Sequence, residues 1–151
     1  MENINFEKTV LPQIGITAKL AGFYITDHFH ENNIDLSKEQ WLILLRLNEK
    51  DGRVQNDLAL ITNRSKTSLT RLINTIEKKG FVHRVHSKED KRINYIYLTE
   101  KGKEIFERSL PILQNLIKRL QEGIDPEDLK NTIKVLNKIQ KNITKHHLNI
   151  N

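Results

Sequence analysis

The sequence predicts a mainly α-helical chain with one small β-hairpin, which is an α+β fold. Apolar residues recur at helical spacing over most of the 151 residues, whereas after Gly80 they alternate with polar residues in two short runs. Beyond Gly102 the helical spacing returns and continues almost to the end of the chain. The length suits one domain with an extension. The absence of cysteine excludes disulfides, thiolate metal sites and thiol-based redox sensing.

Two helices are predicted in the first third of the chain. The first covers residues 6–30, with Pro12 either in its first turn or at the end of a preceding arm. Its apolar face carries Ile14, Ala18, Ala21, Ile25 and Phe29. The second helix follows Ser37, which can form a capping box with Gln40, and its many apolar residues indicate a mostly buried element. The dipeptide Asp51–Gly52 then marks a turn.

A helix-turn-helix is predicted after this turn. A short helix covers residues 54–62, and a longer one follows Ser65 and stops at Gly80. The short helix is expected to bury Leu58, Ala59 and Ile61. Asn63 lies in the turn between the helices, where asparagine tolerates a left-handed backbone better than most residues. Two helices joined by a tight turn, the second with a polar outer face, form a helix-turn-helix.

The longer helix has two distinct faces. Its apolar stripe consists of Leu69, Leu72, Ile73 and Ile76. Its other face carries Lys66, Thr67, Thr70, Arg71 and Asn74. All five side chains can form hydrogen bonds and none is acidic. A face of this kind can bind base edges and phosphates. The alternative is an ordinary surface helix that is polar on its outer side.

The alternating runs predict a β-hairpin formed by residues 81–87 and 93–99. Phe81 and Val85 are expected to pack against a core, and the tip at residues 88–92 is wholly charged. A helix-turn-helix followed directly by such a hairpin is a winged helix. A flexible basic tip can reach a neighbouring groove or the phosphate backbone.

The positive charge of the chain is concentrated in this region. Residues 53–92 contain ten Lys or Arg and four Asp or Glu, so their net charge of +6 equals that of the whole chain. The remaining residues contain 15 basic and 15 acidic side chains and are neutral. A concentrated basic patch of this kind indicates a polyanionic partner.

The same region resembles the MarR family of transcription regulators over residues 37–102. The resemblance is carried by Leu58–Ala59, by S-K-T-S-L-T-R-L-I and by E-K-K-G-F-V-H-R. Its most specific part is D-x-R followed by L-T-x-x-G, which is Asp90, Arg92, Leu98, Thr99 and Gly102. In the family, the arginine matching Arg92 enters the minor groove and the aspartate matching Asp90 holds it. The departures are Asn63 in the turn and Lys91 between the motif residues, and neither removes a needed group.

The family fold implies a homodimer. Residues 1–36 and 103–151 would be dimerisation helices, and residues 37–102 would be the winged-helix DNA-binding region. Pro111 is expected to kink or interrupt one of these helices, and Asp125 is expected to cap the last one. That helix carries a partial heptad of Leu129, Ile133, Leu136 and Ile143. Long amphipathic helices need a surface to pack on, and a two-fold partner supplies it, the alternative being packing within one subunit.

We therefore expect a sequence-specific regulator, most simply a repressor, that binds double-stranded DNA as a homodimer on an inverted-repeat operator. The candidates for reading bases in the major groove are Thr67, Ser68, Thr70 and Arg71. The candidates for contacts to the DNA backbone are Arg64, Ser65, Lys66, Lys88 and Lys91. Arg92, oriented by Asp90, is the candidate for the minor groove.

The resemblance also implies a small aromatic or lipophilic effector that would release the regulator from DNA. Phe23, Trp41 and Leu45 are the candidates for lining its pocket, although each also suits the core. We expect no catalytic residue, metal or cofactor, because no catalytic motif is present. No secretion signal or membrane-spanning apolar run is visible, so a soluble cytoplasmic protein without a membrane partner is expected.

Three other functions are weighed against this expectation. A winged helix that binds proteins instead of DNA would show apolar contacts on the helix face and would not need ten basic residues there. A histidine-dependent hydrolase or transferase would need a pocket that converges on His83 or His86. Zinc sensing would need histidines that face one another, and the spacing of His28 and His30 on a helix does not favour this.

Overall fold

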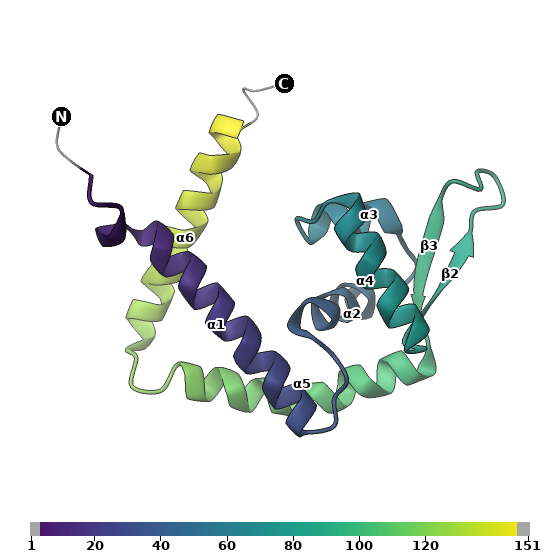
Figure 1. Ribbon diagram of the computed structural model, residues 1–151, viewed down its shortest axis with the longest axis horizontal. Helices are drawn as coiled ribbons and strands as arrows, with labels where there is room; N and C mark the ends of the chain where they lie inside the picture. Colours follow the sequence, from purple (N-terminus) through teal and green to yellow (C-terminus); the bar gives the residue numbers. More distant parts are fainter. Residues whose placement is uncertain (1–3, 148–151) are drawn as a thin grey trace. The chain divides into compact units, whose positions relative to one another are not determined.

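The computed structural model describes residues 4–147. Its elements, drawn in Figure 1, are η1 (Phe6–Lys8), α1 (Val10–Glu31), α2 (Lys38–Glu49), β1 (Arg53–Val54), α3 (Gln55–Ile61), α4 (Lys66–Lys78), β2 (Val82–His86), β3 (Asn94–Leu98), α5 (Glu100–Leu120) and α6 (Pro126–His147). The chain consists of two compact units, Met1–Leu116 and Ile117–Asn151, whose boundary lies within α5. The mainly α-helical fold with a small sheet is the predicted fold class.

The first unit is built on a hydrophobic core that α2, α4 and β3 share with their neighbours. Fully buried side chains of this core include Leu44, Leu47, Leu58, Ile73, Ile76 and Ile96. Trp41 belongs to the same core, where its ring stacks on Phe106 and its indole N–H donates to the Ser109 hydroxyl at 2.7 Å. The predicted capping box at Ser37 and Gln40 is present at the start of α2.

The wing is a three-stranded antiparallel sheet in the order β1-β3-β2. The two long strands pair from Val82 with Leu98 to His86 with Asn94, as the predicted hairpin requires. The sequence did not indicate β1, because a strand of only two residues has no alternating pattern to detect. Through β1, the turn after α2 is fixed to the wing immediately before α3 begins.

Two predicted core positions are wrong. Val85 is 44% exposed, whereas Val82 is buried opposite Leu98, so the buried side of β2 is the one that carries Val82. Ile61 is 41% exposed, because α3 ends at this residue and buries only Leu58 and Ala59. Both errors concern short elements in which a shift of one residue changes the face that a side chain occupies.

The junction between β3 and α5 explains the L-T-x-x-G motif. The Thr99 hydroxyl donates to the Gly80 carbonyl at 2.6 Å and accepts from the Gly102 N–H at 3.0 Å. The Thr99 N–H donates to the Phe81 carbonyl at 3.0 Å. A Cβ atom on Gly102 would collide with that same carbonyl group. These contacts lock the end of the wing and the start of α5 to the end of α4.

The helix α5 continues across Pro111, so of the two effects predicted for this proline, a kink or an interruption, the interruption does not occur. In the second unit, the Asp125 carboxylate accepts from the Glu127 N–H at 2.8 Å and caps α6, in which Pro126 is the first residue. Large apolar side chains on α6, among them Ile133 and Ile143, are exposed. None of the helices within residues 4–147 is long and apolar enough to cross a membrane.

Candidate nucleic-acid interface

The orientation of α4 follows from its two faces. Leu69, Ile73 and Ile76 are buried in the core, and the side chains on the opposite face therefore point to solvent. The helix starts at an N-cap in which the Ser65 hydroxyl accepts from the Ser68 N–H at 3.1 Å. Asn63 has a φ of +51°, which is the left-handed conformation expected in the turn before this helix. A shallow depression of about 360 Å³ runs along the first turns of α4.

The four predicted base-reading residues differ in exposure and in the hydrogen bonds that their side chains already form within the protein. Arg71 is exposed, and no side-chain hydrogen bond or ion pair within residues 4–147 engages its guanidinium. Thr67 is exposed, whereas Ser68 is half-buried and accepts from Arg64 at 3.3 Å. The Thr70 hydroxyl donates to the Lys66 carbonyl at 2.8 Å and accepts from the Gln55 amide at 3.1 Å. Of these four residues, Arg71 and Thr67 therefore present an uncommitted polar group to a ligand of this face.

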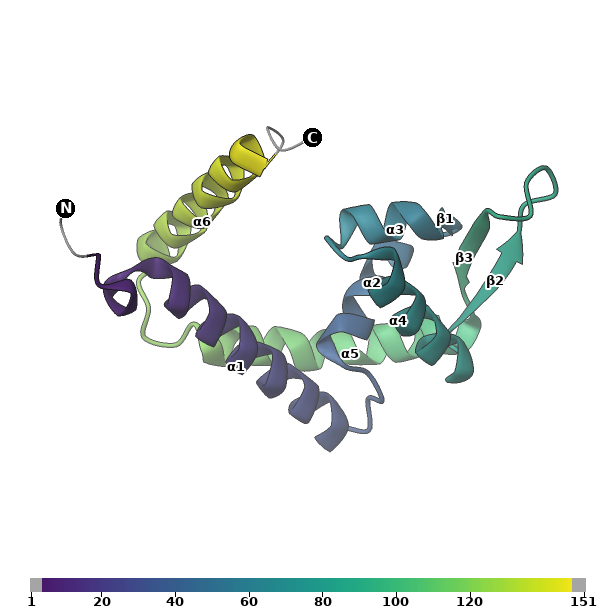
Figure 2. The same cartoon turned by 45° about the horizontal axis from the view of Figure 1, so that its top comes forward.

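The wing presents Arg92 in a fixed position. The carboxylate of Asp90 accepts from the Arg92 backbone N–H at 3.0 Å, and its two oxygens accept from Nε and Nη2 of the guanidinium at 3.1 Å each. The Arg92 side chain is nevertheless 90% exposed. The bidentate pair restricts an exposed arginine that would otherwise be mobile at the loop tip, which Figure 2 shows projecting beyond β2 and β3.

The ion pair with Arg92 changes the pKa of the Asp90 carboxyl group. The Arg92 side chain, and then its backbone N–H, lower the pKa of the Asp90 carboxyl below its ordinary value. A carboxyl with a lowered pKa stays charged to lower pH, so the pair should persist until the pH falls through that lowered value. In an NMR titration, Asp90 should titrate below an ordinary aspartate in the wild type and return towards the ordinary pKa in Arg92→Ala. An unchanged Asp90 pKa in that variant would contradict the pairing.

The basic segment contributes fewer free charges than its composition indicates. Lys79 pairs with Asp35 at 2.8 Å, and Arg84 pairs with Glu77 at 2.7 Å. Arg53 donates to the Arg46 carbonyl at 2.8 Å and lies beside Glu49. Of the seven other basic side chains of the segment, Arg92 pairs with Asp90, whereas no ion pair among the described residues involves Arg64, Lys66, Arg71, Lys78, Lys88 and Lys91. They lie on α4 with its preceding turn and at the tip of the wing.

Sequence reasoning missed Gln55 and the role of Arg84. Gln55 is the first residue of α3, and its amide lies between Thr70 of α4 and Arg84 of β2. Nothing in the local sequence marks it, because its partners are 15 and 29 residues away along the chain.

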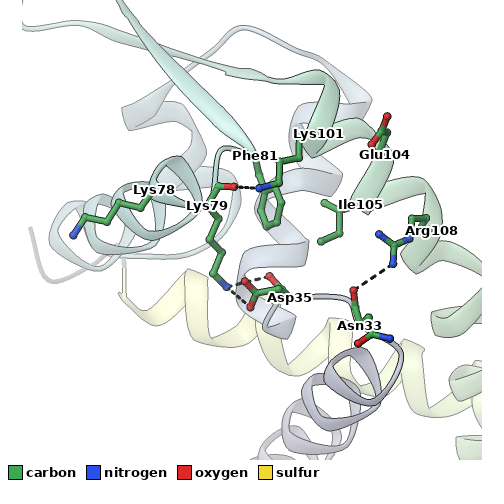
Figure 3. Close-up of a pocket in the computed structure, with 9 residues that line it drawn as sticks. All are labelled: Asn33, Asp35, Lys78, Lys79, Phe81, Lys101, Glu104, Ile105 and Arg108. Atoms are coloured by element: carbon green, nitrogen blue, oxygen red, sulfur yellow. Dashed lines mark hydrogen bonds and ion pairs between the residues drawn. The ribbon is translucent and has the colours of Figure 1, made fainter.

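Within residues 4–147, the three predicted effector residues lie in different surroundings. Trp41 is buried and hydrogen-bonded in the core, Leu45 packs against that core, and Phe23 is 60% exposed on α1. The cavity of about 430 Å³ in Figure 3 is lined instead by Asn33, Asp35, Lys78, Lys79, Phe81, Lys101, Glu104, Ile105 and Arg108. Its Lys79, Lys101 and Arg108 side chains are each hydrogen-bonded to a neighbouring carbonyl or carboxylate group.

The wing histidines do not gather into a site. The His83 ring stacks on Tyr97 with ring centres 5.5 Å apart, and His86 is exposed. Neither residue lines the cavity of Figure 3 or the depression along α4. Within the described part of the chain, no three His, Asp or Glu side chains are grouped as metal ligands.

Comparison with known proteins shows similarity in both sequence and structure. The model of the MarR family matches residues 36–93. The uncharacterized HTH-type transcriptional regulator YybA of Bacillus subtilis (strain 168) is 28% identical over 138 residues, which cover 89% of this chain and 88% of the relative.

Solved structures share the fold. A MarR protein from Peptoclostridium difficile DA00132 superimposes with a TM-score of 0.83 at 22% identity, covering 100% of this chain and 98% of that one. The MepR protein of S. aureus, solved as a MepR–DNA complex, gives a TM-score of 0.79 at 21% identity, covering 89% and 98%.

Proposed function

This chain belongs to the MarR family, and on that premise we propose that it is a transcriptional regulator that binds double-stranded DNA in a sequence-specific manner. The observation that carries the proposal is the pair of exposed arginines on one winged helix. Arg71 is uncommitted on the outer face of α4, and Arg92 is held outward by Asp90 at the tip of the wing. Two relatives support the same function, because MepR was solved in complex with DNA and YybA is named an HTH-type transcriptional regulator.

In this proposal α4 enters a major groove and the wing reaches the flanking minor groove. Thr67, Ser68, Thr70 and Arg71 face the bases, with Arg71 best suited to O6 and N7 of a guanine. Arg64, Ser65, Lys66, Lys88 and Lys91 face the phosphates, and Arg92 enters the minor groove. Among the described residues, no exposed large apolar side chain interrupts the polar face of α4, which disfavours a module that binds proteins through this helix.

We propose further that the protein acts as a homodimer. Leu20 and Phe23 on α1 and Ile133 and Ile143 on α6 are large apolar side chains that the single chain leaves exposed. A second copy would bury them. Two winged helices related by a two-fold axis would bind half-sites about one helical turn apart, ~34 Å, so the operator would be an inverted repeat. Occupying such a site would repress a promoter that overlaps it.

An effector would release DNA by favouring a dimer whose two α4 helices are wrongly spaced. Of the three candidate pocket residues, Phe23 is the one whose ring the single chain exposes. A small aromatic or lipophilic molecule that contacts Phe23 at the dimer helices fits this proposal.

Selection of bound sequences from a random double-stranded DNA pool tests the function. The expected result is an enriched inverted repeat, with a complex whose mass in analytical ultracentrifugation corresponds to two chains on one duplex. If no sequence is enriched and no band shift occurs even at low salt, the regulator proposal is wrong and a protein-binding winged helix becomes the better explanation.

Arg92→Ala is expected to weaken binding to all duplexes with only a modest loss of sequence preference, because a minor-groove arginine reads mainly groove width and charge. The slope of log K against log salt should fall by about one, since one cation is removed from the interface. Fluorescence anisotropy at a series of salt concentrations measures both quantities. Lys103→Ala, which removes an exposed charge on α5 outside the basic segment, is the matched control and should retain the wild-type slope.

A further inference from the structure

We propose that Arg84 is a positioning residue that sets which hydrogen-bonding groups Gln55 and Asn74 offer to DNA. This inference rests on the proposed function. Arg84 lies on β2, Gln55 begins α3, and Asn74 is on α4, so one guanidinium joins three elements of the winged helix.

Each of the three guanidinium nitrogens of Arg84 donates one hydrogen bond to another side chain of the protein. Its Nη1 donates to Glu77 at 2.7 Å, its Nε donates to the Gln55 side-chain oxygen at 3.3 Å, and its Nη2 donates to the Asn74 side-chain oxygen. Glu77 also accepts from the Arg84 backbone N–H at 3.3 Å. With its charge paired to Glu77 and only 22% of its side chain exposed, Arg84 is poorly placed to bind phosphate. Its role is geometric.

Arginine has only N–H donors, so each amide must turn its oxygen towards Arg84. The Gln55 amide therefore points its nitrogen at Thr70, where one N–H donates to the hydroxyl at 3.1 Å. The Asn74 amide likewise keeps its nitrogen away from Arg84. Both amides consequently present N–H groups, and not carbonyl oxygens, to whatever α4 meets.

Whether an amide presents its N–H group or its carbonyl oxygen determines which base edges it can recognise. In the major groove, N–H donors pair with acceptors such as N7 and O6 of guanine, N7 of adenine and O4 of thymine. A free amide can instead turn its oxygen outwards and accept from the amino group of cytosine or adenine. Asn74 lies on the same face as Thr67, Thr70 and Arg71 at helical spacing, so the fixed amide is part of the reading surface. Without Arg84 the amides would rotate, and the discrimination between acceptors and donors would be lost.

The test compares binding to the selected site with binding to a mixed-sequence duplex. The double variant R84M/E77Q removes the ion pair, keeps the stem of the side chain and leaves the net charge unchanged. We expect the ratio of specific to non-specific affinity to fall about tenfold, with the salt slope unchanged. Lys88→Met is the control, because loss of a phosphate contact should lower the slope by about one and leave the ratio intact.

A second variant separates positioning from folding. Gln55→Met removes the donor while Arg84 keeps Glu77 and Asn74, and it should reduce the same ratio. The triple variant that combines Gln55→Met with R84M/E77Q should reduce the ratio of specific to non-specific affinity by less than the product of the two separate reductions. The reason is that both changes act through the Gln55 amide. If Gln55→Met and R84M/E77Q both retain the wild-type ratio, or if R84M/E77Q changes only the salt slope, the inference is wrong. If R84M/E77Q does not fold, the ratio for Gln55→Met alone decides. Failure of the wild type to bind any DNA would instead overturn the proposed function.

Discussion

Gly102→Ala is expected to lower the free energy of unfolding by about 2–3 kcal/mol, one of the largest effects of a single methyl group in this chain. The new Cβ would collide with the Phe81 carbonyl oxygen and lie 2.9 Å from the carbonyl carbon. The obstructing atoms belong to the backbone, which cannot rotate away as a flexible side chain can. The same carbonyl accepts from the Thr99 N–H, so relief of the collision would also disturb the junction between the wing and α5.

Thermal unfolding followed by circular dichroism measures this effect. For a chain of this length the loss corresponds to a decrease in Tm of roughly 4–12 °C. Gly22→Ala is the matched control, because the nearest atom to its new Cβ is the mobile Lys38 Cδ at 3.8 Å and alanine favours the helix. Gly22→Ala should therefore keep or raise the Tm. Equal Tm values for Gly102→Ala and the wild type would contradict the close packing at Phe81.

Arg71→Ala is expected to weaken binding to the selected DNA site by about 1–3 kcal/mol, the discrimination that one bidentate contact to guanine provides. Arg71 is the exposed residue of the α4 face with the strongest hydrogen-bonding group, and no side-chain contact within residues 4–147 occupies it. The folded state should be nearly unaffected, since the substitution removes no internal contact of that guanidinium. The loss should therefore appear in binding and not in Tm.

The preference at one base pair should relax in the same variant. Substituting each position of the selected site and measuring affinity would reveal it, because Arg71→Ala should equalise the four bases at one position in each half-site. Lys66→Ala is the control on the same helix. Because Lys66 is a candidate for a phosphate contact, this variant should bind all sequences more weakly and lower the slope of log K against log salt by about one. An Arg71→Ala protein with the wild-type base preferences would exclude Arg71 from base reading.

The motif D-x-R followed by L-T-x-x-G, the most specific part of the family resemblance, has two parts with different roles. Asp90 and Arg92 form a local pair in which the arginine is exposed, and Arg92 is a proposed DNA contact. Thr99 and Gly102 serve the fold, since they join the wing to α5 through Gly80 and Phe81. The motif therefore combines one candidate binding group with one structural junction.

The sequence alone determined the helices, the hairpin, the caps at Ser37, Ser65 and Asp125, and the outward face of α4. These features depend on periodicity and on contacts between residues a few positions apart, which can be recognised in a linear pattern.

Only the tertiary structure decided how the charges and polar groups are used. Arg84 contacts residues 7, 10 and 29 positions away, and these contacts pair its charge within the protein, whereas the sequence showed it only as one of ten basic residues of the segment. The exposure of Val85, the strand β1 and the contact between Gly102 and Phe81 likewise depend on segments brought together by folding. Such contacts are set by three-dimensional packing, and no short-range pattern in the sequence encodes them.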